Sequence, residues 1–245
     1  MNELNELNED IKKYQIALSL IEGVGDVIGK KLLAFTGSAK AVFFAKRNEL
    51  EEIEGIGKVL VKSILSTDVL ARAEHELKWM EKEGVNHLFY SDKHYPNRLK
   101  QCEDAPLNLF YKGDIDWNKD KFISIVGTRK ASSFGRQFTN DLVKELAPYN
   151  PVIVSGLAHG IDVAAHKAAL QHGLKTIAVF AHSLDKVYPA AHATVARSIV
   201  SNGCLLTDYL SGTSALPQNF VSRNRIVAGL SDATIVIESA AKGHG

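Results

Sequence analysis

Two segments in the second half of the chain share one order: an apolar β-branched run, a glycine-containing loop and a helix-forming stretch. The first runs through residues 122–126, 127–135 and 136–146, and the second through 152–154, 155–162 and a helix opening at Val163. A strand that stops at a glycine loop and continues as a helix directs backbone N–H groups out of the sheet. With the positive helix end, these groups form an anion site. Two such loops on one sheet predict a polyphosphate ligand, either a nucleotide or a nucleic-acid strand.

The alternation of strand and helix continues towards the end of the chain. Strands are expected at residues 122–126, 152–154, 176–180, 204–207 and 234–237, and helices at 136–146, 163–172, 194–201 and 223–230. Near-continuous Val/Ile strands joined by helical crossovers are typical of a parallel sheet covered on both faces. We therefore expect a Rossmann-like, doubly wound α/β domain over residues 119–245, with its ligand at the carboxyl ends of the strands.

Residues 1–68 predict a small all-α domain instead. The turns Glu22-Gly23-Val24-Gly25 and Glu54-Gly55-Ile56-Gly57 each lie between two short apolar helices, an order that resembles two helix-hairpin-helix motifs in a SAM-like domain. N–H groups at the start of the second helix of such a motif can meet a DNA phosphate. Because this segment is acidic, a pure packing role stays open. Residues 69–118 are expected to connect the domains, with a helix over 69–82 that Gly84 caps.

Composition narrows the class of protein. The formal net charge is +1, but from Asp120 onward twelve Lys/Arg face eight Asp/Glu, which gives this part a net charge of +4 and favours an anionic ligand. There is no signal-peptide pattern and no apolar run of the roughly 18 residues that a spanning helix needs. Cys102 and Cys204 lie far apart, which favours reduced thiols. We expect a cytoplasmic protein without a membrane partner.

The first loop departs from the dinucleotide fingerprint, since Gly127 and Gly135 are too far apart for G-x-G-x-x-G. We therefore expect no NAD or FAD and no other cofactor. Arg129 can pair bidentately with a phosphate. Thr128 and Ser132 can donate hydroxyl hydrogen bonds to the same phosphate, although Ser132 fits a helix cap equally well.

The second loop contains Ser155, Gly156 and Gly160, which set its backbone, and Asp162, which is expected to cap the helix opening at Val163. The histidines are scattered over separate loops, so no metal site is expected.

Two arginines flank an asparagine in Arg223-Asn224-Arg225. Residues two apart on a helix point in different directions. One arginine can therefore face the ligand while the other secures a loop, against Asp208 or Glu238, and a buried structural arginine is the rival for either. Phe134, Tyr188 and Phe220 are candidate stacking surfaces, with packing in the core or rim as the alternative.

Several motifs in one order resemble those of the DprA/Smf family of DNA-processing proteins. They are V-G-T-R at 126–129, S-G-L-A-H-G-I-D at 155–162, L-D-x-x-Y-P at 184–189 and R-N-R-I-V-A-G-L at 223–230. The resemblance implies a protein, not an enzyme, that binds and protects single-stranded DNA in natural transformation, works as a homodimer and loads the RecA recombinase. The predicted DNA- or phosphate-binding residues are Gly127, Thr128, Arg129, Ser132, Ser155, Gly156, Gly160, Lys186, Arg223, Asn224 and Arg225, with no catalytic residue.

The sequence departs from that family pattern in three places. Ala181-His182 replaces glycines after the third strand, and Ala190 replaces a basic residue, for which Lys186 or Lys175 can compensate. The family continues beyond Gly245 with a helix and a last strand, so the domain is expected to be truncated and its dimer weakened. The alternative function is a nucleoside monophosphate hydrolase. Its Pro-Gly-Gly-x-Gly-Thr segment is absent here, and Glu238 is the only carboxylate at the relevant strand end.

Overall fold

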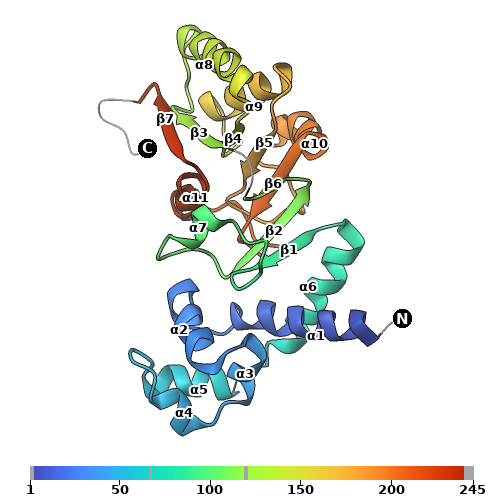
Figure 1. The fold of residues 1–245 in the computed structure, drawn as a ribbon, viewed down its shortest axis with the longest axis vertical. Coiled ribbons are helices and arrows are strands. Elements are labelled where there is room, and N and C mark those ends of the chain that lie inside the picture. The colour runs from blue at the N-terminus through green and yellow to red at the C-terminus, as the bar shows by residue number, and fades with distance from the viewer. Residues whose placement is uncertain (1–2, 67, 119–120, 240–245) are drawn as a thin grey trace. The chain divides into compact units, whose positions relative to one another are not determined.

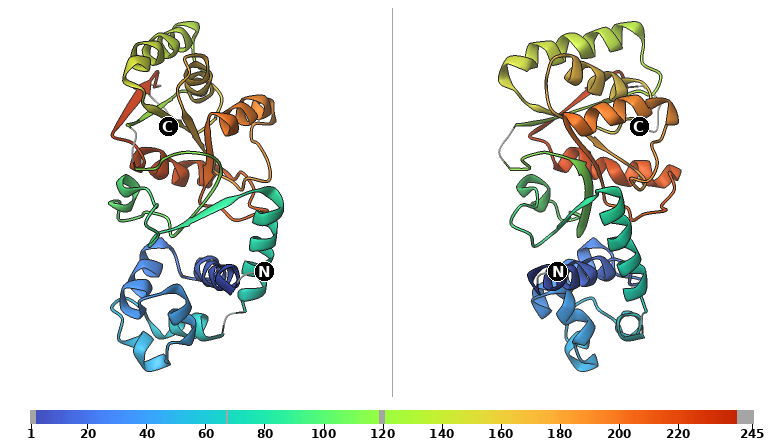
Figure 2. Two further views of the ribbon diagram at one scale, coloured as in Figure 1. Left: turned by 45° about the vertical axis from the view of Figure 1, so that its right-hand side comes forward. Right: turned by 90° about the vertical axis from the view of Figure 1, so that its right-hand side faces the viewer.

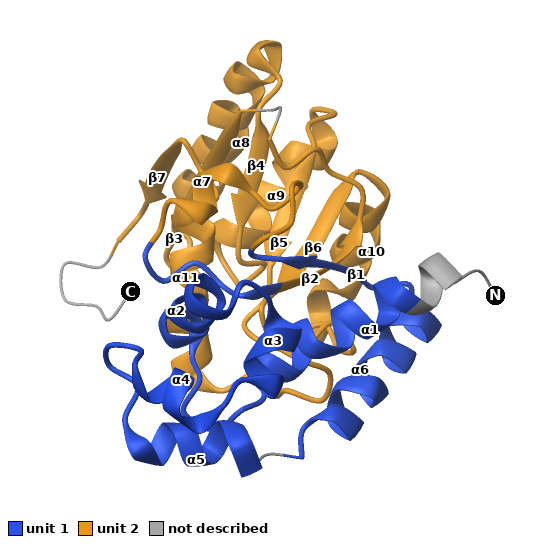
Figure 3. Ribbon diagram, turned by 60° about the horizontal axis from the view of Figure 1, so that its bottom comes forward, with its two compact units in different colours: residues 1–90, 103–108 blue, residues 91–102, 109–245 orange. Residues whose placement is uncertain are grey.

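The computed structural model describes residues 3–66, 68–118 and 121–239, which divide into two compact units (Figure 3). The N-terminal unit comprises Met1–Tyr90 and Glu103–Asn108, and the C-terminal unit comprises Ser91–Cys102 and Leu109–Gly245. The chain thus leaves the N-terminal unit after Tyr90 and contributes to it again at Glu103–Asn108. The connector expected over residues 69–118 is divided between the two units.

The N-terminal unit is helical, apart from one strand, in its described residues. Its elements are α1 (Glu3–Leu18), α2 (Asp26–Thr36), α3 (Ala39–Phe44), α4 (Arg47–Glu51), α5 (Lys58–Ser66), α6 (Leu70–Glu83) and β1 (Asn86–Phe89). Gly23 and Gly55 have left-handed φ angles of 85° and 84°, which glycine adopts without steric cost. These turns let the flanking helices close over a shared core that includes Leu32 and Val61. The predicted helical domain is confirmed, and Gly84 caps α6 as expected.

The first Gly-x-Gly hairpin holds the returning segment of the same unit. Asp26 at the start of α2 accepts the Leu107 N–H (2.8 Å), and the Lys30 ammonium donates to the Ala105 carbonyl (3.2 Å). Gly29 leaves the space that the Leu107 side chain fills, because a Cβ there would overlap it. This helix start is therefore engaged within the chain.

The C-terminal unit contains a mostly parallel sheet. Its strands are β2 (Asn108–Gly113), β3 (Phe122–Gly127), β4 (Val152–Ser155), β5 (Thr176–Val179), β6 (Gly203–Thr207) and β7 (Ala233–Ile237). They are arranged in the order β2-β6-β5-β4-β3-β7. β3 to β7 run parallel, with Gly127 opposite Ile237 and Ile123 opposite Ile153, whereas β2 runs antiparallel to β6. The sheet confirms the predicted doubly wound α/β class.

Helices cover both faces of this sheet (Figures 1 and 2). One face carries α8 (Ser133–Leu146), α9 (Ile161–Gln171) and α10 (Ala193–Ser201), and the other carries α7 (Asn97–Lys100) and α11 (Pro217–Gly229). Ile125, Ile153 and Ala165 belong to the core between the sheet and α9. α11 begins at Pro217, well before the predicted residue 223, because proline is preorganised for the first helical position. Among the helices of the described ranges, none combines the length and apolar character that crossing a bilayer requires.

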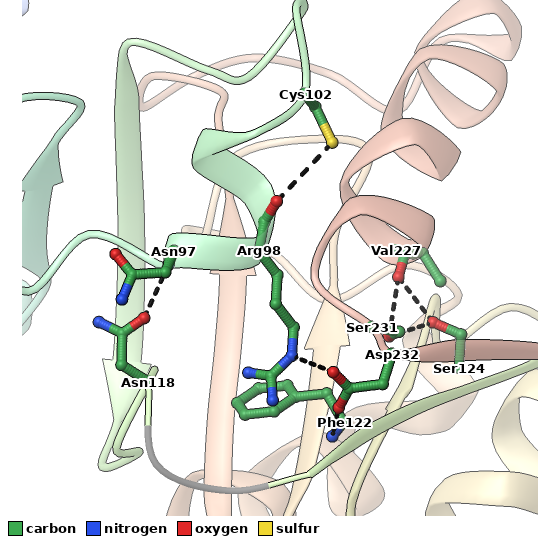
Figure 4. A network of polar contacts seen from close by, with 9 residues as sticks. All are labelled: Asn97, Arg98, Cys102, Asn118, Phe122, Ser124, Val227, Ser231 and Asp232. Carbon is green, nitrogen blue, oxygen red and sulfur yellow. Dashed lines mark hydrogen bonds and ion pairs between the residues drawn. The ribbon is translucent and has the colours of Figure 1, made fainter.

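A polar network anchors the carboxyl end of α11 to the start of β3 (Figure 4). The Arg98 guanidinium donates to Asp232 (2.6 Å), whose second carboxylate oxygen accepts the Phe122 N–H (2.9 Å). Burial acts to raise the pKa of Asp232, but these two hydrogen bonds and the charge of Arg98 outweigh it, so the pKa is lowered. The Ser124 hydroxyl donates to the Val227 carbonyl (2.6 Å). α11 is thereby fixed on the sheet that carries the candidate site.

Candidate nucleic-acid interface

The candidate site lies where β3, β4 and β5 end side by side. Three loops follow these strands: the first loop (residues 127–132), the second loop (156–160) and the third loop (180–189). α11 packs against β5 and adds its own side chains to this edge. Ligands of open α/β sheets bind at this end of the strands.

The first loop is attached at both ends to Glu238, the residue after β7. The Glu238 carbonyl accepts the Thr128 N–H (2.9 Å), and its carboxylate accepts the N–H (2.8 Å) and the hydroxyl of Ser132. The Ser132 hydroxyl also accepts the Gly135 N–H (2.9 Å) and so caps α8. The two Ser132 hydrogen bonds hold the pKa of Glu238 below its usual value. The open anion site expected at the start of α8 is thus filled by a carboxylate of the chain itself.

Gly160 joins the second loop to the first. Its φ angle is +82°, and a Cβ would overlap the Thr128 carbonyl oxygen. That same oxygen accepts the Ile161 N–H (3.2 Å). Because Thr128 and Gly160 touch through their backbones, the two predicted loops form one continuous surface.

Asp162 does not cap a helix opening at Val163, as the sequence suggested. α9 begins at Ile161, and Gly160 is the residue before it. The Asp162 carboxylate is buried and accepts the Ala158 N–H (3.4 Å). Burial raises its pKa, against the opposing effect of the nearby Arg223 charge. The second loop, like the first, therefore holds an internal carboxylate.

Arg223 is 4% exposed, so it does not present its guanidinium to solvent. It donates to the carbonyls of Gly156 (2.8 Å) and Val179 and so joins the second loop to the end of β5. A Cβ at Gly156 would overlap the guanidinium, which accounts for the glycine. Burial lowers the pKa of Arg223, and the Asp162 carboxylate offsets part of that effect. The structure favours the interpretation of Arg223 as a buried structural arginine.

Arg225 pairs with Asp208 (2.6 Å), and the side chains are 20% and 13% exposed, respectively. This is one of the two loop-securing partners that the sequence left open. Asn224, between the arginines, is exposed and accepts the Arg223 Nε–H (3.3 Å) on its side-chain oxygen.

A cation and two rings from three elements lie in a row: Arg129 on the first loop, Phe220 on α11 and Tyr188 on the third loop. The Arg129 guanidinium carbon is 5.2 Å from the centre of the Phe220 ring, and the centres of Phe220 and Tyr188 are 5.8 Å apart. Tyr188 is 54% exposed. Lys130 and Lys186 are exposed on the first and third loops. Guanidinium over an aromatic face is a favourable cation–π geometry, so Arg129 is held with its charge at the surface.

The predicted site residues divide by exposure. Arg129, Ser132, Lys186 and Asn224 are exposed, Gly127, Thr128, Gly160 and Arg225 are partly buried, and Ser155, Gly156 and Arg223 are buried. The Ser155 hydroxyl donates to the Ile125 carbonyl (2.6 Å) and so joins β4 to β3.

Lys130 and Glu238 were not among the predicted residues. The position of Lys130 beside Arg129 was a usable signal, whereas the attachment of Glu238 to the first loop spans more than a hundred residues and gives no local signal.

Buried His166, behind the second loop, is uncharged at neutral pH. Burial first, and then the charge of Arg223, lower its pKa to about 3. Its Nδ1 lies 2.7 Å from the Thr176 hydroxyl. Within the ranges that the structure describes, no three His, Cys, Asp or Glu side chains gather as metal ligands would.

Comparison with known proteins identifies relatives over nearly all of this architecture. The family model described as DNA recombination-mediator protein A matches residues 86–244. The Protein Smf of Synechocystis is 32% identical over 94% of this chain and 58% of its own length. The DNA processing protein DprA of Streptococcus pneumoniae is 43% identical over 60% of this chain and 52% of its own. The chain spans roughly half the length of the curated relatives that it matches.

Two solved structures share the fold. The X-ray structure of DprA from Streptococcus pneumoniae has a TM-score of 0.77 and 31% identity, covering 96% of this chain and 79% of the other. A structure of DNA processing protein A from Helicobacter pylori, whose study describes its single-stranded DNA binding mode, has a TM-score of 0.59 and 32% identity. That match covers 65% of this chain and 71% of the other.

Proposed function

Since this chain belongs to the DNA recombination-mediator protein A family, the DprA/Smf proteins, we propose that it binds single-stranded DNA at the edge formed by the three loops. The observation that carries the proposal is the row formed by exposed Arg129, half-buried Phe220 and exposed Tyr188. Single-stranded DNA is bound without sequence preference by cations that follow its backbone and by rings on which bases stack. The single-stranded DNA binding of the Helicobacter pylori relative supports the same ligand class.

In this proposal the DNA phosphates are bound mainly by side chains, and less by backbone N–H groups at the starts of helices. Arg129 offers a bidentate pairing surface. Lys130, its neighbour in the sequence, and Lys186 on the third loop add exposed charge. The N–H groups of Ser132 and Gly135 bond within the chain. Arg223 and Arg225 do not contact the DNA in this proposal. Arg223 fixes the second loop by its hydrogen bond to Gly156, and Arg225 holds α11 in place by its ion pair with Asp208.

The partners that we propose beyond DNA are the RecA recombinase and a second copy of the chain. The family's description as a recombination mediator supports the first. Loading of RecA onto coated single-stranded DNA, followed through the RecA ATPase, tests it. Sedimentation of the chain with and without an oligonucleotide tests self-association.

The first prediction concerns Arg129. We expect Arg129→Ala to weaken the binding of a fluorescein-labelled oligo-dT about 10- to 100-fold at low salt, because a hydrogen bond to a charged group is worth about 1.5–3 kcal/mol. Fluorescence anisotropy measures the affinity. Lys167→Ala on α9 is the matched control, since Lys167 is exposed and its loss changes the net charge equally. Equal affinities of the two variants, or no binding by the wild-type chain, would contradict the proposal.

A further inference from the structure

Glu238 occupies the position where an open α/β sheet ordinarily receives its ligand. The chain proceeds from β3 through β4 and β5 to β6 in one direction, and β7 then returns to the other side of β3. The strand order therefore reverses between β3 and β7, and ligands of such sheets bind in the crevice at that point. Here the residue after β7 is Glu238, and its carboxylate meets the start of α8.

Two features of the backbone adapt to this side chain. Glu238 has a φ angle of +52°, in the left-handed region that residues other than glycine seldom adopt. Gly135 on the facing helix leaves room for the carboxylate, because a Cβ there would overlap it. A phosphate could reach the Ser132 N–H only by displacing Glu238.

The same residue fixes the part of the first loop that carries the cations. Thr128 is attached to the Glu238 carbonyl and Ser132 to its carboxylate, and Arg129 and Lys130 lie between these two points. The Thr128 N–H···O distance is 2.9 Å and the Ser132 N–H···O distance is 2.8 Å. A loop held at both ends loses little conformational freedom when it binds, which favours affinity.

We propose that Glu238 is a positioning residue for DNA binding: it closes the crevice between β3 and β7 and holds Arg129 over Phe220, where Arg129 receives the phosphate. The proposal rests on the proposed function. In this proposal Glu238 contributes to binding because its side chain is long enough to hydrogen-bond Ser132. Its negative charge does not contribute, since a carboxylate near the DNA is by itself repulsive.

The test separates reach from charge with two variants. Glu238→Asp keeps the charge but is one methylene too short to hold Ser132. Glu238→Gln keeps the length and removes the charge: its amide oxygen can still accept the Ser132 N–H, and its NH2 group can donate to the Ser132 hydroxyl oxygen instead of accepting from it. We expect Glu238→Asp to weaken oligo-dT binding about fivefold, in the range of couplings within one hydrogen-bond network. Glu238→Gln is expected to bind within about twofold of Glu145→Gln, which removes an exposed charge from the last turn of α8.

A double variant shows whether Glu238 acts through Arg129. We expect Glu238→Asp to have no further effect in the Arg129→Ala background. A loss of affinity that persists there, or tighter binding by Glu238→Asp than by the wild type, would overturn the inference while leaving the DNA-binding proposal intact. Binding of oligo-dT by Glu238→Asp with the affinity of the wild type would also overturn the inference about Glu238 and leave the DNA-binding proposal intact. Failure of the wild-type chain to bind oligo-dT would instead remove the proposed function itself. Thermal unfolding of each variant checks that all are folded.

Discussion

Single glycines decide how closely the two loops of the candidate interface approach. Gly160 has a left-handed φ and faces the Thr128 carbonyl, whereas Gly173, after α9, has a similar φ of +72° with open space around it. Both positions favour glycine for conformational reasons, but only Gly160 also touches another loop. Gly160 also has a ψ angle of −123°, outside the left-handed helical region, so it combines greater backbone strain with the steric overlap, whereas Gly173 shows the cost of a positive φ in open space.

We expect Gly173→Ala to lower the free energy of unfolding by about 1 kcal/mol, the cost of a left-handed residue with a Cβ. Gly160→Ala should lower it by about 3 kcal/mol, because the loops must also move apart. Urea denaturation followed by circular dichroism measures both. Gly160→Ala should in addition weaken oligo-dT binding, and equal losses of stability in the two variants would show that the loops yield without cost.

Helix α11 contains two arginines that make different structural contacts. Arg223 turns into the unit towards Gly156 and Val179, and Arg225 pairs with Asp208 at the end of β6. The ion pair of Arg225 with Asp208 is mostly shielded from water, so removing Arg225 leaves the Asp208 carboxylate in a poorly hydrated place. The helix is thus held against the sheet by polar contacts as well as by its apolar face.

We expect Arg225→Ala to destabilise the fold by about 2 kcal/mol, somewhat less than the loss for a fully buried pair because both groups keep some exposure. Adding Asp208→Asn should restore part of that loss, because the shielded carboxylate charge that Arg225 had balanced is then gone. Chemical denaturation of both single variants and the double variant gives the coupling energy. Strict additivity would mean that the ion pair contributes nothing to holding α11.

The elements were largely predictable, whereas the contacts between loops were not. Apolar runs identified β3 to β7. The fully buried strands β4, β5 and β6 are mostly apolar, as expected of strands covered on both faces, whereas β7 is mostly exposed. The start of α11 at Pro217 was missed, although proline at the first helical position is a recognised signal. The attachment of Glu238 to Ser132 joins residues 106 apart in sequence, and no local pattern encodes such a pairing. For the same reason the sequence overestimated the N–H groups left free for an anion.

For the whole molecule, the formal charge of +1 conceals an uneven distribution, with +4 on the part from Asp120 onward. Binding that depends on this charge must weaken as salt rises, because cations on the protein release counterions from the DNA. Arg129, Lys130 and Lys186 are the exposed cations on the first and third loops. Their number sets the steepness of the expected salt dependence.

We expect the logarithm of the oligo-dT association constant to fall with the logarithm of salt concentration with a slope of about −2, at about −0.7 per neutralised phosphate. Arg129→Ala should reduce the slope to about −1.4, and Lys167→Ala should leave it unchanged. Anisotropy titrations over a salt series measure it. A flat dependence would show that the strand is held by contacts other than those to its phosphates.

The return of Glu103–Asn108 to the N-terminal unit has a consequence for the order of events in synthesis. Leu107 is fully buried in the core of that unit, against α2. A ribosome adding about 5–20 residues per second must work for several seconds after finishing α2 before Leu107 exists. Throughout that interval the growing chain carries an unfilled apolar site at Gly29. The helical unit, although first to be made, is completed only by residues that are translated after its last helix.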